Sequence, residues 1–152
     1  MAHRFKARIV WTGASDGPAV SYDGYSREHL IEIDGKPPLR GSSAPAFRGN
    51  PGLHNPEDLL VASISACHML WYLHLCTDAG IHVSAYADDP EGTMDLRDGK
   101  MVFTGVVLRP RVTIIEGDAS EALALHRDAN SACFIANSMS FPVHHEPEIE
   151  RV

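Results

Sequence analysis

Two cysteines set far apart in the chain are the residues best placed to do chemistry. Cys67 lies in an apolar stretch that follows Asn55–Asp58, and Cys133 lies within Ser131–Ile135. Two thiols on structured elements suggest redox chemistry, which depends on the thiolate form of one of them. Two unrelated buried thiols are the alternative for cysteines so distant in sequence, and local geometry does not separate the two possibilities.

The third cysteine, Cys76, is a poor partner for Cys67. It follows Cys67 by nine residues on the same predicted helix. At about 100° per residue the two side chains face opposite sides, and they lie roughly 13 Å apart along the axis. A disulfide needs a Cα separation of about 4.4–6.8 Å. We therefore expect Cys76 to be a buried core residue, as free cysteines often are.

Glu57 is the acidic residue that could act on the first thiol. It precedes Cys67 by ten residues, so it is too far along a helix to touch the sulfur. It is either a first-turn acid favoured by the helix dipole or the partner of an arginine that reaches the thiol. A guanidinium can pair with a carboxylate and donate to sulfur as well, and its charge favours the thiolate. The candidates are Arg48 and then Arg40, for which a solvent-exposed loop charge is the alternative.

Nine histidines raise the question of a metal site. Cys67 and His68 point in different directions on a helix, and His144 and His145 would alternate across a strand. The chain has no Cys-x-x-Cys or His-x-x-x-His pair, no glycine-rich nucleotide motif and no Gly-x-Ser-x-Gly elbow. We expect neither metal nor cofactor. A metal-binding module built on Cys67, His68 and other histidines is a weaker alternative.

A long helix must position Cys67. Asn55 can cap it, Pro56 suits its first position, and Asp58 completes a capping box. The helix is predicted from about Pro56 to Ala79, with Gly80 just beyond its end. Apolar residues on nearly every side are typical of a central helix that is packed all round.

The remaining elements predict an α+β fold with strands grouped by hairpins. Turns are expected at Asp34-Gly35 and Asp98-Gly99. A second helix starts at Asp118 and breaks at Asn130-Ser131. Residues 36–55, rich in proline and glycine, are expected to form a long loop of functional importance. Strands are predicted at residues 5–11, 29–33, 81–87, 101–108, 111–115 and 142–152.

Length and composition indicate one globular domain over residues 1–152. The net charge of −7 argues against binding to nucleic acid or an anionic membrane. No uninterrupted apolar run reaches the roughly 18 to 20 residues of a membrane span, and residues 1–6 lack a signal-peptide core. We expect a cytoplasmic protein, a setting in which thiols stay reduced unless they are catalytic or redox-sensing.

Three segments resemble the OsmC/Ohr superfamily of osmotically inducible and organic-hydroperoxide-resistance proteins. They are Asn55–Leu60, Ser65–His68 and Ala132–Ser138. The resemblance covers nearly the whole chain in element order. It implies an OsmC-like α+β fold with an antiparallel sheet and a long central helix. It also implies an intertwined homodimer with two active sites at the dimer interface.

The same resemblance implies a thiol-dependent peroxidase, a peroxiredoxin-like oxidoreductase that reduces organic hydroperoxides to alcohols. Cys67 would attack the peroxide and become a sulfenic acid, and Cys133 would condense with it to a disulfide. Glu57 would hold an arginine against the Cys67 thiolate. An external dithiol would then reduce the disulfide by exchange.

The chain departs from the organic-hydroperoxide-resistance branch in Gly13–Gly17, where Ser15 stands in place of that branch's arginine. The osmotically inducible branch takes its arginine from the loop before the helix, which makes Arg48 the equivalent and places the chain nearer that branch. His68 and His54 are interpreted as packing and loop variants or as changes in substrate access. The missing early arginine motivates an alternative function, a non-catalytic binding or redox-sensing protein with an apolar pocket at the dimer interface.

Overall fold

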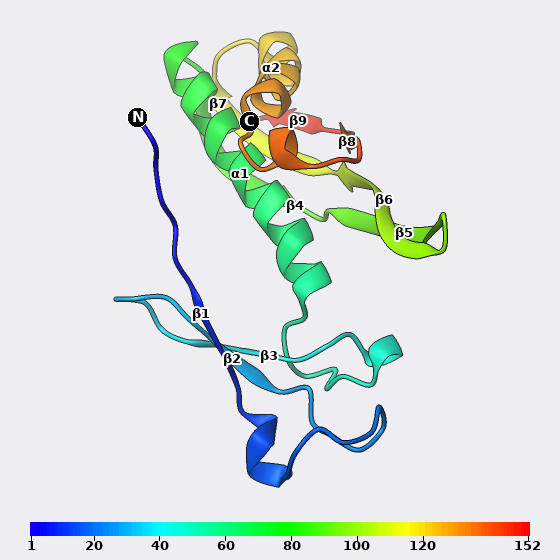
Figure 1. Cartoon of the computed structure of the whole chain (residues 1–152). Coiled ribbons are helices and arrows are strands. Elements are labelled where there is room, and N and C mark those ends of the chain that lie inside the picture. The colour runs from blue at the N-terminus through cyan, green and yellow to red at the C-terminus, as the bar shows by residue number, and fades with distance from the viewer. The chain divides into compact units, whose positions relative to one another are not determined.

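The computed structural model describes all residues from 1 to 152 and divides into two compact units, residues 1–60 and 61–152 (Figure 1). Two α-helices, nine strands and three short 3₁₀ helices make up the chain. The expected α+β class is confirmed. The long helix α1 (Pro56–Asp78) begins in the first unit and continues into the second.

The first unit holds a three-stranded antiparallel sheet of order β1-β2-β3. The Asp34-Gly35 turn joins the second strand to the third, with Gly35 at a φ of 75° that favours glycine. The prediction of one long loop over residues 36–55 is partly wrong, because a strand and a 3₁₀ turn lie within this segment. The strand, β3, is ordered by its pairing with the free edge of β2. The elements are β1 (Arg8–Trp11), β2 (His29–Glu32), β3 (Leu39–Gly41) and 3₁₀ turns at Gly13–Asp16 and Pro45–Phe47.

The start of α1 has the Asn55 cap expected from the sequence, with Asp58 accepting from the Asn55 side chain rather than from its backbone N–H. Asn55 Oδ1 accepts the Asp58 N–H at 2.8 Å, and Asn55 Nδ2 donates to Asp58 Oδ2 at 2.8 Å. The helix ends before Gly80, whose φ is 69°. The Ile81 N–H then returns to the Cys76 carbonyl at 2.9 Å, which satisfies a carbonyl at the helix end. Because both ends are fixed in this way, Cys67 lies on a well-defined helix.

Only one stripe of α1 is buried, at four-residue intervals: Ile64, His68, Tyr72 and Cys76. The expectation that α1 is buried on every side is therefore wrong for the single chain. The helix is also long and apolar enough to cross a membrane by length and composition alone, contrary to our expectation. The core helix of a soluble protein passes the same test, and only 22% of its most apolar window is buried. Much apolar helix surface remains uncovered.

The second unit contains two three-stranded sheets, of order β4-β7-β9 and β5-β6-β8. Each sheet is mixed rather than antiparallel, because β8 pairs with β6 and β9 pairs with β7 in parallel. The predicted last strand is thus two strands, which the Glu146-Pro147 break sends to different sheets. The strands are β4 (His82–Asp88), β5 (Glu91–Arg97), β6 (Lys100–Leu108), β7 (Pro110–Glu116), β8 (Val143–His145) and β9 (Glu148–Arg151).

Strand β5 was not predicted, although its hairpin turn to β6 was. Asp98 and Gly99 have φ values of 49° and 77°, both positive, as the two central residues of a type I′ hairpin require. The strand is polar and largely exposed, so its hydrophobic alternation is weak. Figure 1 shows the hairpin extending from the second unit.

Helix α2 (Ala119–Ala132) is capped by Asp118, which accepts the Glu121 N–H at 2.8 Å, as the sequence indicates. The predicted break at Asn130-Ser131 is wrong, because the helix continues to Ala132. Ala129, just before the expected break, is fully buried and keeps this turn packed. Together α1, α2, β4 and β7 enclose one core, made of Tyr72, Cys76, Ile81, Val112, Ile114, Ala122 and Ala129.

Candidate active site

The structure brings Cys67 and Cys133 together. Cys67 lies on α1, and Cys133 ends α2, where its N–H donates to the Ala129 carbonyl at 2.9 Å. The Cys133 thiol lies within hydrogen-bonding reach of the Cys67 thiol. All three cysteines of the chain are free. A thiol on α1 thus lies close to a thiol just past the end of α2, and such proximity is one requirement of a reversible disulfide.

The two thiols differ in exposure. Cys133 is fully buried, with its Sγ 4.0 Å from the Ile64 carbonyl oxygen and 3.5 Å from the Ala136 N–H that donates to it. Burial raises the pKa of Cys133 to about 11, and the neighbouring Cys67 raises it further. Cys133 is therefore a protonated thiol at neutral pH. Cys67 is only half-buried, so it is the thiol that a substrate can reach.

Cys76 occupies the core, as expected from its spacing. Its side chain is 1% exposed, and burial raises the pKa of its thiol. Tyr72 and Ile81 belong to the same buried cluster. Cys76 therefore serves packing, and the two thiols that lie close together are those of Cys67 and Cys133.

Glu57 lies in the first turn of α1, about 15 Å along the axis from Cys67. Its Oε2 atom is buried and has no hydrogen-bond partner. A buried carboxylate oxygen without a donor is costly, and a guanidinium is the donor that best matches its geometry. The interpretation of Glu57 as a freely solvated first-turn acid is therefore weakened.

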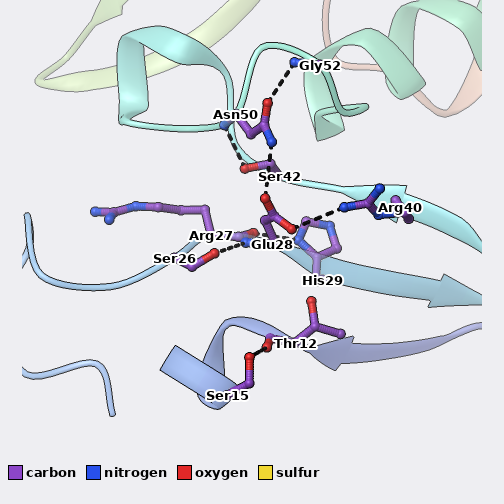
Figure 2. A network of polar contacts seen from close by, with 10 residues as sticks. All are labelled: Thr12, Ser15, Ser26, Arg27, Glu28, His29, Arg40, Ser42, Asn50 and Gly52. Atoms are coloured by element: carbon purple, nitrogen blue, oxygen red, sulfur yellow. Dashed lines mark hydrogen bonds and ion pairs between the residues drawn. The ribbon is translucent and has the colours of Figure 1, made fainter. Parts of the chain in front are cut away.

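Arg40 already has a partner within the first unit. Its guanidinium lies 3.4 Å from Glu28 Oε2, and the other oxygen of Glu28 accepts a hydrogen bond from Asn50 Nδ2 at 3.1 Å (Figure 2). Asn50 is in turn fixed by its backbone N–H, which donates to Ser42 Oγ at 3.0 Å. The network connects β2, β3 and the loop before α1, and it occupies Arg40.

Arg48 has no such carboxylate. Its guanidinium faces the Tyr22 ring at 5.9 Å from the ring centre and makes no ion pair. Its backbone is left-handed, with a φ of 64°, where the chain leaves the 3₁₀ turn at Pro45–Phe47. Of the two candidate arginines, Arg48 is the one still able to bind a carboxylate. Both arginines belong to the first unit and both thiols to the second, so the contact with the thiolate remains a prediction.

The two unusual histidines take part in the structure in different ways. His68 follows Cys67 in sequence but is fully buried on the other side of α1, where it packs against α2. His54 is exposed, and only its carbonyl takes part in the fold, accepting the Ser42 N–H at 2.8 Å. The structure therefore supports a packing role for His68 and a loop position for His54, and an effect of either residue on substrate access remains a prediction.

No group of three or more His, Cys, Asp or Glu side chains is arranged to hold a metal ion. Cys67 and His68, the centre of the metal-binding alternative, point to different surroundings. That alternative therefore has no ligand set in this structure.

The family model described as OsmC-like protein matches residues 49–148, which include α1 with Cys67 and the end of α2 with Cys133. The chain belongs to the OsmC-like family. No curated protein matches it significantly.

Among solved structures, this OsmC-like chain is similar to an OsmC-like protein of unknown function from Vibrio cholerae. The identity is 30% over 97% of this chain and 100% of that chain, with a TM-score of 0.87. An organic hydroperoxide resistance protein OsmC from Legionella pneumophila shares 21% identity over 99% and 98% of the two chains, with a TM-score of 0.71. The organic hydroperoxide resistance protein OhrB of Bacillus subtilis shares 20% over 96% and 98%, with a TM-score of 0.62. The last two comparisons support the fold.

Sequence reasoning missed the apolar surface beside the thiols of this family member. Leu70, one turn after Cys67, is 63% exposed, and Phe134, directly after Cys133, is 68% exposed. The Phe134 ring meets Trp71 edge to face, with ring centres 5.4 Å apart. Exposed aromatic and aliphatic side chains next to reactive groups indicate an apolar ligand or a protein interface. The signal available in the sequence was a large apolar residue at each position.

Proposed function

We propose that this OsmC-like protein is a cytoplasmic thiol peroxidase that reduces organic hydroperoxides. The observation that carries the proposal is the pairing of a half-buried thiol, Cys67, with a buried and protonated thiol, Cys133. A peroxide reaches the first thiol, and the second is held ready to close a disulfide. Family membership supports a redox role for the pair.

The proposed reaction runs in three balanced steps. The Cys67 thiolate attacks the terminal peroxide oxygen, the O–O bond breaks, and the departing alkoxide takes a proton to become an alcohol. Cys67 is now a sulfenic acid. The Cys133 sulfur then attacks the Cys67 sulfur, and the displaced hydroxide leaves with the Cys133 proton as water. An external dithiol reduces the resulting disulfide by exchange and is itself oxidised.

Glu57 and Arg48 supply the charge in this proposal. The unpartnered Glu57 Oε2 accepts from a guanidinium, which holds positive charge beside the thiolate. Arg48 is assigned this role because Arg40 is paired with Glu28. Neither residue transfers a proton or an electron.

A homodimer is part of the proposal. Large apolar side chains are exposed on α1 and after α2, among them Leu70 and Phe134, and most of the apolar window of α1 is uncovered. A second copy of the chain would bury this surface and enclose the thiols. Light scattering coupled to gel filtration measures the mass, and a monomer at micromolar concentration contradicts this part of the proposal.

The peroxidase test uses reduced protein and one equivalent of cumene hydroperoxide. We expect stoichiometric peroxide consumption and a single intrachain Cys67–Cys133 disulfide, detected by peptide mass after proteolysis. With dithiothreitol as reductant the reaction should turn over. Cys67→Ser should abolish consumption. Cys133→Ser should consume one equivalent and leave a sulfenic acid that dimedone traps, whereas the core control Cys76→Ser should behave as the unmodified protein. Full turnover by Cys67→Ser would remove the proposal.

A non-catalytic binding or redox-sensing protein is the second candidate. The exposed Leu70 and Phe134 favour it, because an apolar ligand could bind there without reacting. The same experiment separates the two functions. A redox sensor forms the disulfide and is reduced again, but at a rate far below that of a peroxidase, and a pure binding protein forms no disulfide and consumes no peroxide.

A further inference from the structure

Two buried histidines lie between α1 and α2 and are not used by the proposed reaction. His68 Nε2 lies 3.0 Å from His126 Nδ1, and both side chains are 0% exposed. The rings are nearly coplanar, at 7°, with centres 5.3 Å apart. Such geometry corresponds to one N–H···N hydrogen bond between two neutral imidazoles, with one ring as donor and the other as acceptor.

The outer nitrogens of this pair have no partner. His68 Nδ1 and His126 Nε2 are both buried without a hydrogen bond. Whichever ring donates, one buried N–H and one buried lone pair stay unmatched. A further proton would turn the lone pair into a second unmatched N–H and place a positive charge in the core, which is expensive without a counter-charge.

The groups around the pair offer no negative charge. From α1, Tyr72 stacks on His126 with ring centres 3.8 Å apart, and its hydroxyl donates to the Ala122 carbonyl. From β8, His145 lies 5.9 Å and 6.2 Å from the two rings, and its own Nδ1 is buried without a partner. Tyr86 from β4 lies behind Tyr72, and burial raises the pKa of both tyrosines.

Burial therefore keeps both imidazoles neutral. It lowers the pKa of His68 from 6.5 to about 4, with help from the charge that His145 would carry. It lowers the pKa of His126 to about 3, with help from His68 and His145. The pKa of His145 is also lowered, by burial and by its exposed neighbour His144. A state in which these rings meet water would take up protons at a higher pH than the packed state does.

The pair lies between the two helices that carry the thiols. His68 is the residue after Cys67 on α1, and His126 precedes Cys133 by seven residues on α2. Its single hydrogen bond joins the two helices across the core. Separation of α2 from α1 would move Cys133 away from Cys67 and expose it.

We propose that the His68–His126 pair is an acid-operated switch, in which proton uptake separates α2 from α1 and uncouples the two thiols. The inference concerns helix packing and stands whether or not the protein reduces peroxides. Well above pH 6.5 both rings are neutral in the packed and the opened state, so opening is independent of pH there. Between pH 6.5 and about 4 only the opened state gains protons. The equilibrium constant between the packed and the opened state then favours opening by up to about tenfold more for each unit that the pH falls, for each ring. For the pair together the factor is up to about a hundredfold per pH unit.

Cys133 reports on the opening. Cys67 is first blocked irreversibly with iodoacetamide at pH 8, so that Cys133 cannot close a disulfide with it. The protein is then treated with 4,4′-dithiodipyridine between pH 7.5 and 4.5, and labelling of Cys133 is followed by peptide mass. Each rate is divided by that of urea-unfolded protein at the same pH, which removes the intrinsic pH dependence of the thiol. We expect little change of this ratio near pH 7.5 and a steep rise below pH 6.5.

Two variants test whether the rise in the Cys133 labelling ratio comes from the His68–His126 pair. The double variant His68→Leu with His126→Leu replaces both partners by apolar side chains of similar size, so it should lose most of the rise, leaving only the part due to His145. The control His3→Gln removes an exposed histidine and should follow the unmodified protein. A flat ratio in the unmodified protein, or the same rise in the double variant, overturns the proposal.

A measurement on the unmodified protein decides the matter even where the double variant does not fold. Side-chain ¹⁵N spectra at pH 5.5 should show His68 and His126 neutral in the folded protein. Charged imidazoles at both positions, with Cys133 still protected from labelling, would overturn the proposal.

Discussion

Ser65 on α1 donates a hydrogen bond of 2.5 Å to the carboxylate of Asp88 at the end of β4. The other oxygen of Asp88 accepts the Arg109 N–H at 2.6 Å. One carboxylate therefore ties the helix, two residues before Cys67, to the sheet of the second unit and to the turn between β6 and β7. The thiol is held through this contact as well as by the buried stripe of α1.

Ser65→Ala should destabilise the protein by about 1–3 kcal/mol, because it removes a hydrogen bond to a charged acceptor and leaves Asp88 Oδ2 unpaired. Urea unfolding followed by far-UV circular dichroism measures the loss. Ser84→Ala is the matched control, since Ser84 makes only an exposed, 3.3 Å hydrogen bond to the Thr113 carbonyl. Equal losses for the two variants would contradict the structural role of Ser65.

The three thiols should react with iodoacetamide in a fixed order. At pH 8 we expect Cys67 first, because it is half-buried, and Cys133 and Cys76 only on unfolding, because they are 0% and 1% exposed and burial raises the pKa of both. Peptide mass after timed quenching gives the three rates. Alkylation of Cys133 ahead of Cys67 would reverse the proposed roles.

The two candidate arginines should differ in their effect on Cys67. Arg48→Ala is expected to slow Cys67 alkylation at pH 7 about tenfold, which corresponds to about 1.4 kcal/mol of lost thiolate stabilisation. Arg40→Ala should leave that rate unchanged, because its guanidinium is paired with Glu28. The same slowing in Glu57→Gln as in Arg48→Ala would link the carboxylate to the arginine. No slowing in any of the three variants removes Glu57 and both arginines from the site.

The Asn55 cap at the start of α1 should contribute measurably to the free energy of unfolding. Asn55→Ala removes the acceptor of the Asp58 N–H and should cost about 0.5–2 kcal/mol. Asn55→Ser keeps a side-chain acceptor and should recover most of the loss. Thermal unfolding of the three proteins gives the comparison, and an Asn55→Ser variant as unstable as Asn55→Ala would argue against capping as the cause.

Stability should fall at alkaline pH because of Cys133. Burial raises the pKa of this thiol in the folded protein from 9.0 to about 11, so the unfolded chain releases its proton first as the pH rises. The stabilising protonated form is fully present below pH 9 and its contribution is lost by pH 11, a change of about 2–3 kcal/mol. Urea unfolding at pH 8 and pH 10.5 measures it. Cys133→Ala should lack this part of the fall, and an identical fall in that variant would refute the assignment.

Local chemistry made the helix starts predictable. The sequence predicts a cap at the start of α1 from Asn55 and Asp58, and a cap at the start of α2 from Asp118. The structure contains both caps. The Asp98-Gly99 turn was equally plain. Boundaries set by tertiary packing were not visible: α2 passes through Asn130 because Ala129 is buried, and β8 and β9 join different sheets.

The candidate site was predictable only in part. The spacing of Asn55, Glu57 and Cys67 predicted that these three residues lie on or beside one helix, which accounts for one half of the candidate site. The nearness of Cys133, and the pairing of His68 with His126, join residues more than fifty positions apart, and no local pattern encodes such contacts. Arg40 could be set aside only once its pairing with Glu28 was seen.

The left-handed backbone of Arg48 has an evolutionary consequence. At a φ of 64° glycine is more comfortable than arginine, so Arg48→Gly would remove the guanidinium and relieve the backbone at the same time. In the proposed role, one substitution would slow the chemistry and leave the fold at least as stable. A lineage could thus lose most of its activity in a single step without losing the fold, and glycine at this position is the mark that such a step would leave.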